Sequence, residues 1–174
     1  MTFPELQIQF DLNPGNRVDV LRNVDTCSKI SIGYLFVDQE DGQCYLFDKN
    51  GHKDDISKVK KIETSTFSNC TSLTSISIPN SVKSIESWAF VNCTSLTTIK
   101  IPDLVESIGD YAFGGCASLT SIKIPNSVEW IGAFAFVYCN FLKELVFKGK
   151  TMKQVKAMEY YPWEITDKSV IKTK

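Results

Sequence analysis

One pattern of apolar and polar positions recurs every 23 residues through the middle of the chain. Its markers are phenylalanines, cysteines and leucines that keep this step: Phe67, Phe90, Phe113 and Phe136; Cys70, Cys93, Cys116 and Cys139; Leu73, Leu96, Leu119 and Leu142. No insertion interrupts the register between Ile62 and Phe147. A fixed period of this length is the signature of a solenoid, because one unit cannot bury its apolar residues alone.

The unit from Leu96 to Cys116 begins with a predicted strand. Residues 98–101 alternate polar and apolar side chains, which is typical of a half-buried strand with Ile99 and Ile101 pointing inward. Pro102 has no amide hydrogen to donate, so we expect the ladder of the strand to end there.

The rest of the unit turns the chain back. Val105 and Ile108 form a second apolar pair and predict a second short extended segment. Gly109-Asp110 is a turn signal. The stretch 112–116 closes the loop, and we expect a turn of α-helix or 3₁₀-helix there.

Stacked units predict an α/β repeat solenoid dominated by short parallel strands. Like side chains would form columns along the array, and neighbouring strands would lie about 4.8 Å apart. Terminal coils would otherwise expose these columns to water, so caps are expected at both ends. The sequence divides into an N-terminal β-rich cap or binding element at 1–57, repeats at 58–147 and a C-terminal cap with a short helix at 148–174.

The N-terminal region carries strand and turn patterns but no repeat. Residues 6–12 alternate as a strand that ends at the turn signal 13–15. Residues 29–37 and 43–47 predict two strands joined by a hairpin at 39–42, and 48–51 predicts a further turn. Composition leaves open whether this region covers the first coil or binds a partner itself.

The C-terminal region predicts a short helix and an aromatic cluster. Thr151 is a candidate N-cap for a helix with Met152 and Val155 on one face, and Pro162 is expected to stop it. The aromatic residues that follow either cover the last coil or form a binding patch: Tyr160, Tyr161 and Trp163.

The repeat unit also has a recognisable form. It reads Leu-x-x-Ile-x-Ile-Pro-x-x-Val-x-x-Ile-x-x-x-Ala-Phe-x-x-Cys, as in the segment that begins Leu96-Thr-Thr-Ile-Lys-Ile-Pro. It resembles the leucine-rich repeats of the BspA-like (Treponema pallidum-type) family, from Val59 to Phe147. The resemblance implies a curved, right-handed solenoid used for binding. Members are common among surface and secreted proteins of host-associated bacteria and some parasitic protists, occur in mobile elements, and include adhesins.

Charge and hydropathy exclude some classes of partner. Lys and Arg total 19 against 20 Asp and Glu, and nucleic-acid binding usually needs a basic face, so this class is disfavoured. Apolar runs are too short to span a membrane, and residues 1–6 show no signal-peptide pattern. We therefore expect a cytoplasmic protein as written, or a secreted or cell-surface protein if a signal has been removed.

Four of the six cysteines occupy one repeat position. Such a ladder favours small buried hydrophobic side chains over disulfides. A metal site needs converging ligands such as Cys-x₂-Cys pairs, and the sequence has none. Cys27 and Cys44 lie outside the array, and one sequence leaves their pairing open.

No catalytic motif accompanies the single histidine. His52 lies in a predicted turn beside Asp54 and Asp55, with no flanking nucleophile motif. The sequence has no phosphate-binding glycine loop, and one acidic pair falls short of a calcium loop. We expect no enzyme activity, cofactor, metal or small-molecule substrate, and interpret His52 as an exposed loop residue.

Outward positions of the repeat predict a binding surface. The strand columns are polar, with Ser77, Lys100, Lys123 and Val146 in one of them. Aromatic residues precede each Ala-Phe pair, and they either pack on neighbouring coils or act as interface hot spots. Trp130 is the strongest candidate, since its counterparts are Ser84 and Ser107. The predicted partner-binding residues are Trp130, Lys100, Lys123, Glu144, Ser121, Thr98, Trp88, Tyr111 and Tyr138, with Phe134 and Phe141 nearby.

These features favour a non-enzymatic protein–protein binding module that uses the repeat face and the aromatic edge. One version is a phage- or mobile-element-borne inhibitor of a host protein. The alternatives are an adhesin-like surface or secreted domain of a host-associated microbe, and a structural domain of a larger protein.

Overall fold

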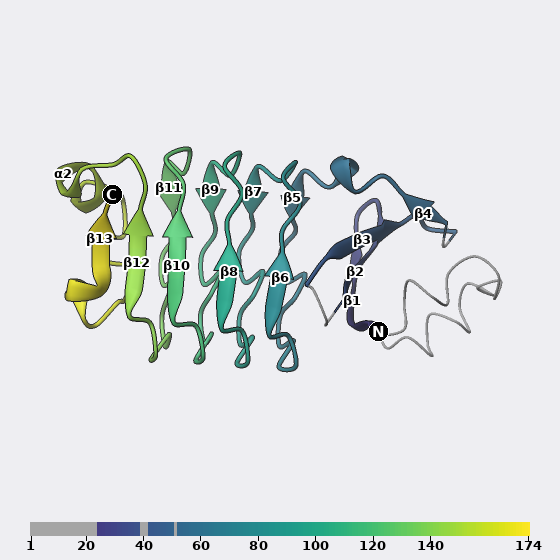
Figure 1. Cartoon of the computed structure of the whole chain (residues 1–174), viewed down its shortest axis with the longest axis horizontal. Helices are drawn as coiled ribbons and strands as arrows, with labels where there is room; N and C mark the ends of the chain where they lie inside the picture. Colours follow the sequence, from purple (N-terminus) through teal and green to yellow (C-terminus); the bar gives the residue numbers. More distant parts are fainter. Residues whose placement is uncertain (1–23, 39–41, 51) are drawn as a thin grey trace.

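Two parallel sheets run along the repeat array, one on each side of the core (Figure 1). The computed structural model describes residues 24–38, 42–50 and 52–174. The front sheet consists of β6 (Ser75–Ser77), β8 (Thr98–Lys100), β10 (Ser121–Ile124), β12 (Glu144–Phe147) and β13 (Ile171–Thr173). The back sheet consists of β5 (Lys61–Ile62), β7 (Ser84–Ile85), β9 (Ser107–Ile108) and β11 (Trp130–Ile131).

The 23-residue period is also the register of the sheets. In the front sheet, Ile122 pairs with Ile99 and Ile99 pairs with Ile76. In the back sheet, Ile131 pairs with Ile108 in the same way. Equivalent residues of successive coils therefore lie side by side, and the predicted parallel-strand repeat solenoid is confirmed.

The third side of each coil consists of turns that bond directly to the next coil. The amides of Trp88, Phe90 and Asn92 donate to the carbonyls of the residues 22 positions further along, at 2.7 to 2.9 Å. Left-handed φ angles of 58° at Trp88 and Asn92 interrupt any helical run. The helical turn expected in each closing loop is therefore wrong for this array, because alternate amides donate to the next coil and only those between them, such as Val91 and Cys93, donate three residues back.

The core is a continuous column of stacked rings and aliphatic side chains. Phe67, Phe90 and Phe113 are fully buried and Phe136 nearly so, with successive ring centroids 5.3, 5.4 and 5.6 Å apart. Burying one such side chain contributes about 1.5–3 kcal/mol, so the column is a main source of stability.

The N-terminal part is a four-stranded antiparallel sheet: β1 (Val24–Ile30), β2 (Gly33–Asp38), β3 (Cys44–Phe47) and β4 (Lys53–Asp54). The single strand predicted over 29–37 is wrong, because a turn at Ser31 and Ile32 separates β1 from β2. The Ser31 amide donates to the Glu63 carboxylate at 3.0 Å, and a Cβ at Gly33 would collide with the Phe47 carbonyl.

The other N-terminal predictions have mixed outcomes. The predicted pairing of 29–37 with 43–47 appears as β2 against β3, and the turn after Phe47 is present at residues 49–50. The predicted strand at 6–12, its turn at 13–15 and residues 39–41 of the hairpin lie outside the described residues.

The C-terminal segment lies against the last coil (Figure 1). Thr151 caps helix α2 (Met152–Lys156), as predicted, and the structure adds a capping box with Gln154. The helix ends at Lys156, so Pro162 is not its stop signal. Trp163 is fully buried, stacks 5.5 Å from Phe147 and meets Phe136 edge-on, so it covers the core column.

Candidate functional site

The outer side of the front sheet is polar and exposed over most of its width. Strand alternation buries Ile99 and Ile122 and leaves Thr98, Lys100 and Lys123 outside. Glu144 is also exposed, and Ser121 is half-buried. The front sheet thus brings together five of the predicted partner-binding residues: Thr98, Lys100, Ser121, Lys123 and Glu144.

Val146 departs from the predicted exposed column. It is 3% exposed, although Lys100 and Lys123 in the same column are exposed. Lys123 on β10 and Lys172 on β13 are its register partners on either side, and their aliphatic stems flank it. The outer column therefore ends on a covered valine.

One hollow on this face combines residues of three coils. It has a volume of ≈320 Å³, and Thr98, Lys100, Ser121, Lys123 and Lys148 contribute its polar lining. At the adjoining edge, Lys172 donates a hydrogen bond to Glu144 at 2.8 Å. This bond and the lysine charge lower the pKa of Glu144, so its carboxylate is ionised at neutral pH.

The aromatic residues before the Ala-Phe pairs form a stacked row on the third side of the coils. Trp88 and Tyr111 have centroids 6.2 Å apart, and Tyr111 and Phe134 have centroids 4.9 Å apart, at interplanar angles of 28° and 15°. Trp88 stays 45% exposed and Phe134 38%. Tyr111 is stacked on both faces, whereas Trp88 and Phe134 at the ends of the row each stack on Tyr111 through one face, so the row keeps ring surface exposed at both ends.

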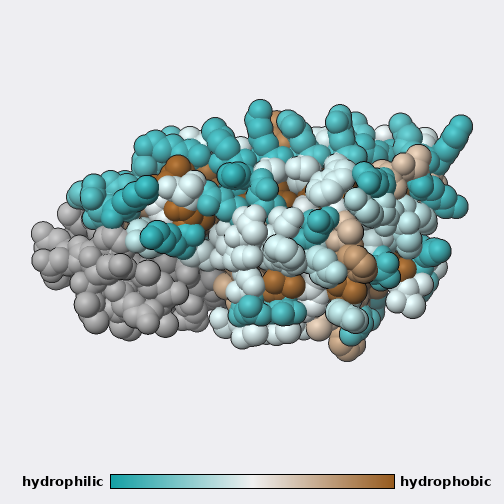
Figure 2. Space-filling view, turned by 180° about the vertical axis from the view of Figure 1, so that it is seen from behind, coloured by the Kyte–Doolittle hydropathy of each residue, from teal (hydrophilic) through white to brown (hydrophobic). Residues whose placement is uncertain are grey.

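The other predicted aromatic residues lie on separate surfaces. Trp130 begins β11 beside Ser107 in the back sheet, so the structure does not bring it to the front-sheet lysines. Tyr138 and Phe141 are strongly exposed in the last turn. Seen from behind in Figure 2, the molecule is mostly polar, with apolar side chains in small separate patches.

Sequence reasoning missed Leu104, which is 54% exposed. Its counterparts Ser81 and Ser127 donate side-chain hydrogen bonds at 2.7 Å to the backbone of the preceding coil, and leucine cannot. A leucine in a serine column was the signal that could have identified it.

The cysteine column is part of the scaffold. Cys93 and Cys116 are fully buried, whereas Cys70 and Cys139, at the two ends of the column, are only half-buried. The thiol of Cys93 donates to the Phe67 carbonyl at 3.0 Å, and Cys116 donates to Phe90 at 3.2 Å. Burial raises the pKa of Cys93 to about 12, so the group remains a poorly nucleophilic thiol.

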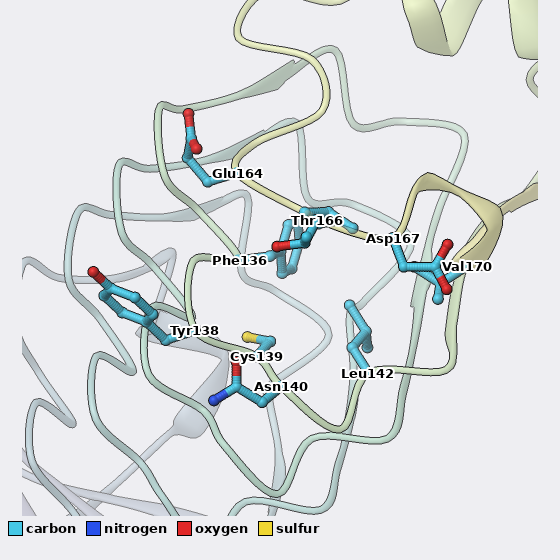
Figure 3. Close-up of a pocket in the computed structure, with 10 residues that line it drawn as sticks. Phe136, Tyr138, Cys139, Asn140, Leu142, Glu164, Thr166, Asp167 and Val170 are labelled. Carbon is cyan, nitrogen blue, oxygen red and sulfur yellow. The ribbon is translucent and has the colours of Figure 1, made fainter.

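A cavity of ≈150 Å³ separates the last turn from the C-terminal segment (Figure 3). Cys139 and Thr166 lie beside it, and burial raises the pKa of Cys139 to about 12. The carboxylates of Glu164 and Asp167 lie on opposite sides of the view and do not converge (Figure 3). The lining therefore lacks the paired acid and base or the activated nucleophile that hydrolytic chemistry needs.

His52 is exposed, and its Nδ1 lies 3.4 Å from Asp48 Oδ2, as fits a loop residue. Over residues 24–38, 42–50 and 52–174, no group of three or more His, Cys, Asp and Glu is arranged to hold a metal ion. In the same described segments, no helix has the length and apolar character to cross a bilayer.

Comparison with known proteins agrees with this geometry. The BspA-type leucine-rich repeat region matches residues 56–167 in 6 copies. No curated protein sequence matches the chain. Leucine-rich repeat proteins are generally non-enzymatic scaffolds that mediate protein interactions.

Three solved structures are similar over most of this chain. A leucine-rich repeat protein from Bacteroides ovatus is 29% identical over 71% of the chain, with a TM-score of 0.53. One from T. pallidum is 26% identical over 70%, with a TM-score of 0.51. A leucine rich cell surface protein from Faecalibacterium prausnitzii is 26% identical over 75%, with a TM-score of 0.55. The matches cover 33%, 60% and 38% of those proteins. The chain belongs to the BspA-type leucine-rich repeat family.

Proposed function

We propose that this chain is a protein-binding module whose main docking surface is the outer side of the front sheet. The observation that carries the proposal is the convergence of Thr98, Lys100, Ser121, Lys123 and Glu144 on one continuous face. Their backbone is held by register pairing with both neighbours, so a partner would meet a rigid surface and little ordering entropy would be lost on binding.

The stacked row of Trp88, Tyr111 and Phe134 supports a secondary contact. Tryptophan and tyrosine are enriched among interface hot spots, and the row keeps ring surface exposed while stacking between its rings stabilises the coils. Trp130 would take part only with a partner that also reaches the back sheet.

A surface role is the version we favour. Its support is the similarity to the Faecalibacterium prausnitzii protein, which is described as a cell surface protein. An inhibitor of a host protein would dock through the same face, so the two roles share the same binding test.

The test is capture of partner proteins by the immobilised chain, quantified by mass spectrometry. Variants would alter one surface at a time: Lys100→Glu with Lys123→Glu on the front sheet, Trp88→Ala with Tyr111→Ala on the aromatic row, and Trp130→Ala on the back sheet. We expect the front-sheet variant to lose most of the captured protein while its circular dichroism spectrum stays unchanged. Equal capture by all variants would remove the front sheet from the interface.

A further inference from the structure

Lysines gather on the front sheet at positions that hold neutral residues elsewhere in the array. Lys100 and Lys123 continue a column that begins with Ser77. In the last coil, Lys143 follows three threonines in its column and Lys148 follows three prolines. The fold therefore does not need lysine at any of these positions, and their convergence is a property of this surface.

These lysines and Lys172 form one basic patch, defined as Lys100, Lys123, Lys143, Lys148 and Lys172. Lys100 and Lys123 are direct register partners, and both line the ≈320 Å³ hollow together with Lys148. Lys143 and Lys172 line the adjoining depression. Ser121 lines both hollows, so the two are adjacent on the outer side of the sheet, and together they are called the trough.

The positive charge of the patch is largely uncompensated. Glu144 is the carboxylate in the trough, and Lys172 already pairs with it at 2.8 Å. In the described part of the chain, Lys100, Lys123, Lys143 and Lys148 form no ion pair with any carboxylate. Like charges on facing strand positions are destabilising, and Ser77 shows that the column tolerates a neutral residue. An anionic partner would offset this repulsion.

We propose that the basic patch docks a short acidic segment of a partner protein, laid across β8, β10, β12 and β13. This inference rests on the proposed function and names the chemistry of the partner. Charge complementarity selects carboxylates, and the hydroxyls of Thr98 and Ser121 in the trough can donate to them. Neighbouring strands lie about 4.8 Å apart, and an extended peptide advances about 3.3 Å per residue, so only a few residues of the segment can lie over the four strands.

Nucleic acid fits this face less well. Single-stranded nucleic acids are held by basic grooves that also offer aromatic platforms for the bases. The outward residues of the front sheet are serine, threonine, lysine, glutamate and the covered Val146, and the stacked aromatic row lies on another side of the coil.

The probe is a fluorescein-labelled peptide of about eight residues in which glutamate alternates with serine, measured by fluorescence anisotropy against the whole chain. The matched control peptide carries glutamine in place of glutamate. We expect saturable binding of the glutamate peptide only, weakened at least about threefold when NaCl rises from about 50 to about 300 mM. Equal binding of both peptides would overturn the proposal.

Variants locate the site. Lys100→Glu, Lys123→Glu and Lys148→Glu together are expected to weaken peptide binding at least about tenfold. The same number of reversals among exposed lysines of the first coils, Lys60→Glu, Lys61→Glu and Lys83→Glu, should change it less than about twofold. Equal losses from both sets would show non-specific attraction and refute the patch.

Two further probes decide the class of ligand. Oligothymidylate and a heparin-derived oligosaccharide with matched charge should bind more weakly than the peptide, and tighter binding of either would overturn the acidic-protein assignment. If the glutamate peptide does not bind but the front-sheet variant still loses captured protein, only the acidic chemistry of the partner is refuted. If all variants capture protein equally but the peptide binds at the patch, only the proposed function is refuted.

Discussion

Phe90 and Phe113 lie with their ring centroids 5.4 Å apart and their planes within 2° of parallel, although a whole repeat unit separates them along the chain. Each ring is fully buried, and each has another phenylalanine on its outer side. Stability is therefore shared between neighbouring coils, and a defect in one ring acts on both interfaces.

Replacing Phe113 by alanine tests this coupling. The change removes a buried ring and leaves a cavity between two coils, so we expect the free energy of unfolding to fall by about 3–5 kcal/mol in urea titrations. Phe141→Ala is the matched control, since Phe141 is 63% exposed and should cost less than about 0.5 kcal/mol. Equal effects of the two changes would contradict a core built from the phenylalanine column.

The buried thiols make the free energy of unfolding depend on pH in the alkaline range. Burial raises the pKa of Cys93 to about 12, while the unfolded thiol ionises near its ordinary value of about 8.5. The native state therefore holds its proton more tightly, and this contribution is complete below the unfolded pKa and is lost as pH rises towards the folded one. We expect the reduced protein to lose stability between about pH 8.5 and about pH 12.

Cys93→Ala separates this effect from the titration of lysine and tyrosine. The variant should show a shallower fall of unfolding free energy over the same pH window, measured by urea titration with a reductant present. Parallel curves for the two proteins would exclude a contribution from the Cys93 thiol.

The C-terminal segment should stabilise the array through Trp163. Its side chain stacks on Phe147 and meets Phe136 edge-on, and its Nε1 donates to the Glu159 carbonyl at 3.1 Å. Trp163→Ala is expected to lower the free energy of unfolding by about 3–5 kcal/mol. It should also remove the most blue-shifted tryptophan emission, whereas Trp88→Ala, at an exposed ring, should remove red-shifted emission.

The repeat architecture could be read from the sequence because each column appears four times with one spacing. Ile99 and Ile101 were placed inward by alternation alone, and Thr151 was placed as an N-cap by its residue type. Each of these inferences rests on local chemistry that the fold repeats without change.

The features that escaped prediction depend on distant segments. Val146 is buried where Lys172 on β13 pairs beside it, and no residue near Val146 in the sequence predicts that β13 joins the sheet there. The closing loops form turns because the amides of Trp88 and Phe90 bond to the next coil rather than within their own. Trp130 and Lys123 fall on different sheets because each coil has three sides, which the period alone does not reveal.

Lys100 and Lys123 share a column with Ser77 while the isoleucines beside them stay constant. Outward residues can thus change from coil to coil while neighbouring positions keep a separation of about 4.8 Å. The buried residues thus fix the spacing of the coils, and each outward residue can be replaced separately. Selection could therefore change the binding specificity of this molecule by single substitutions without changing its fold.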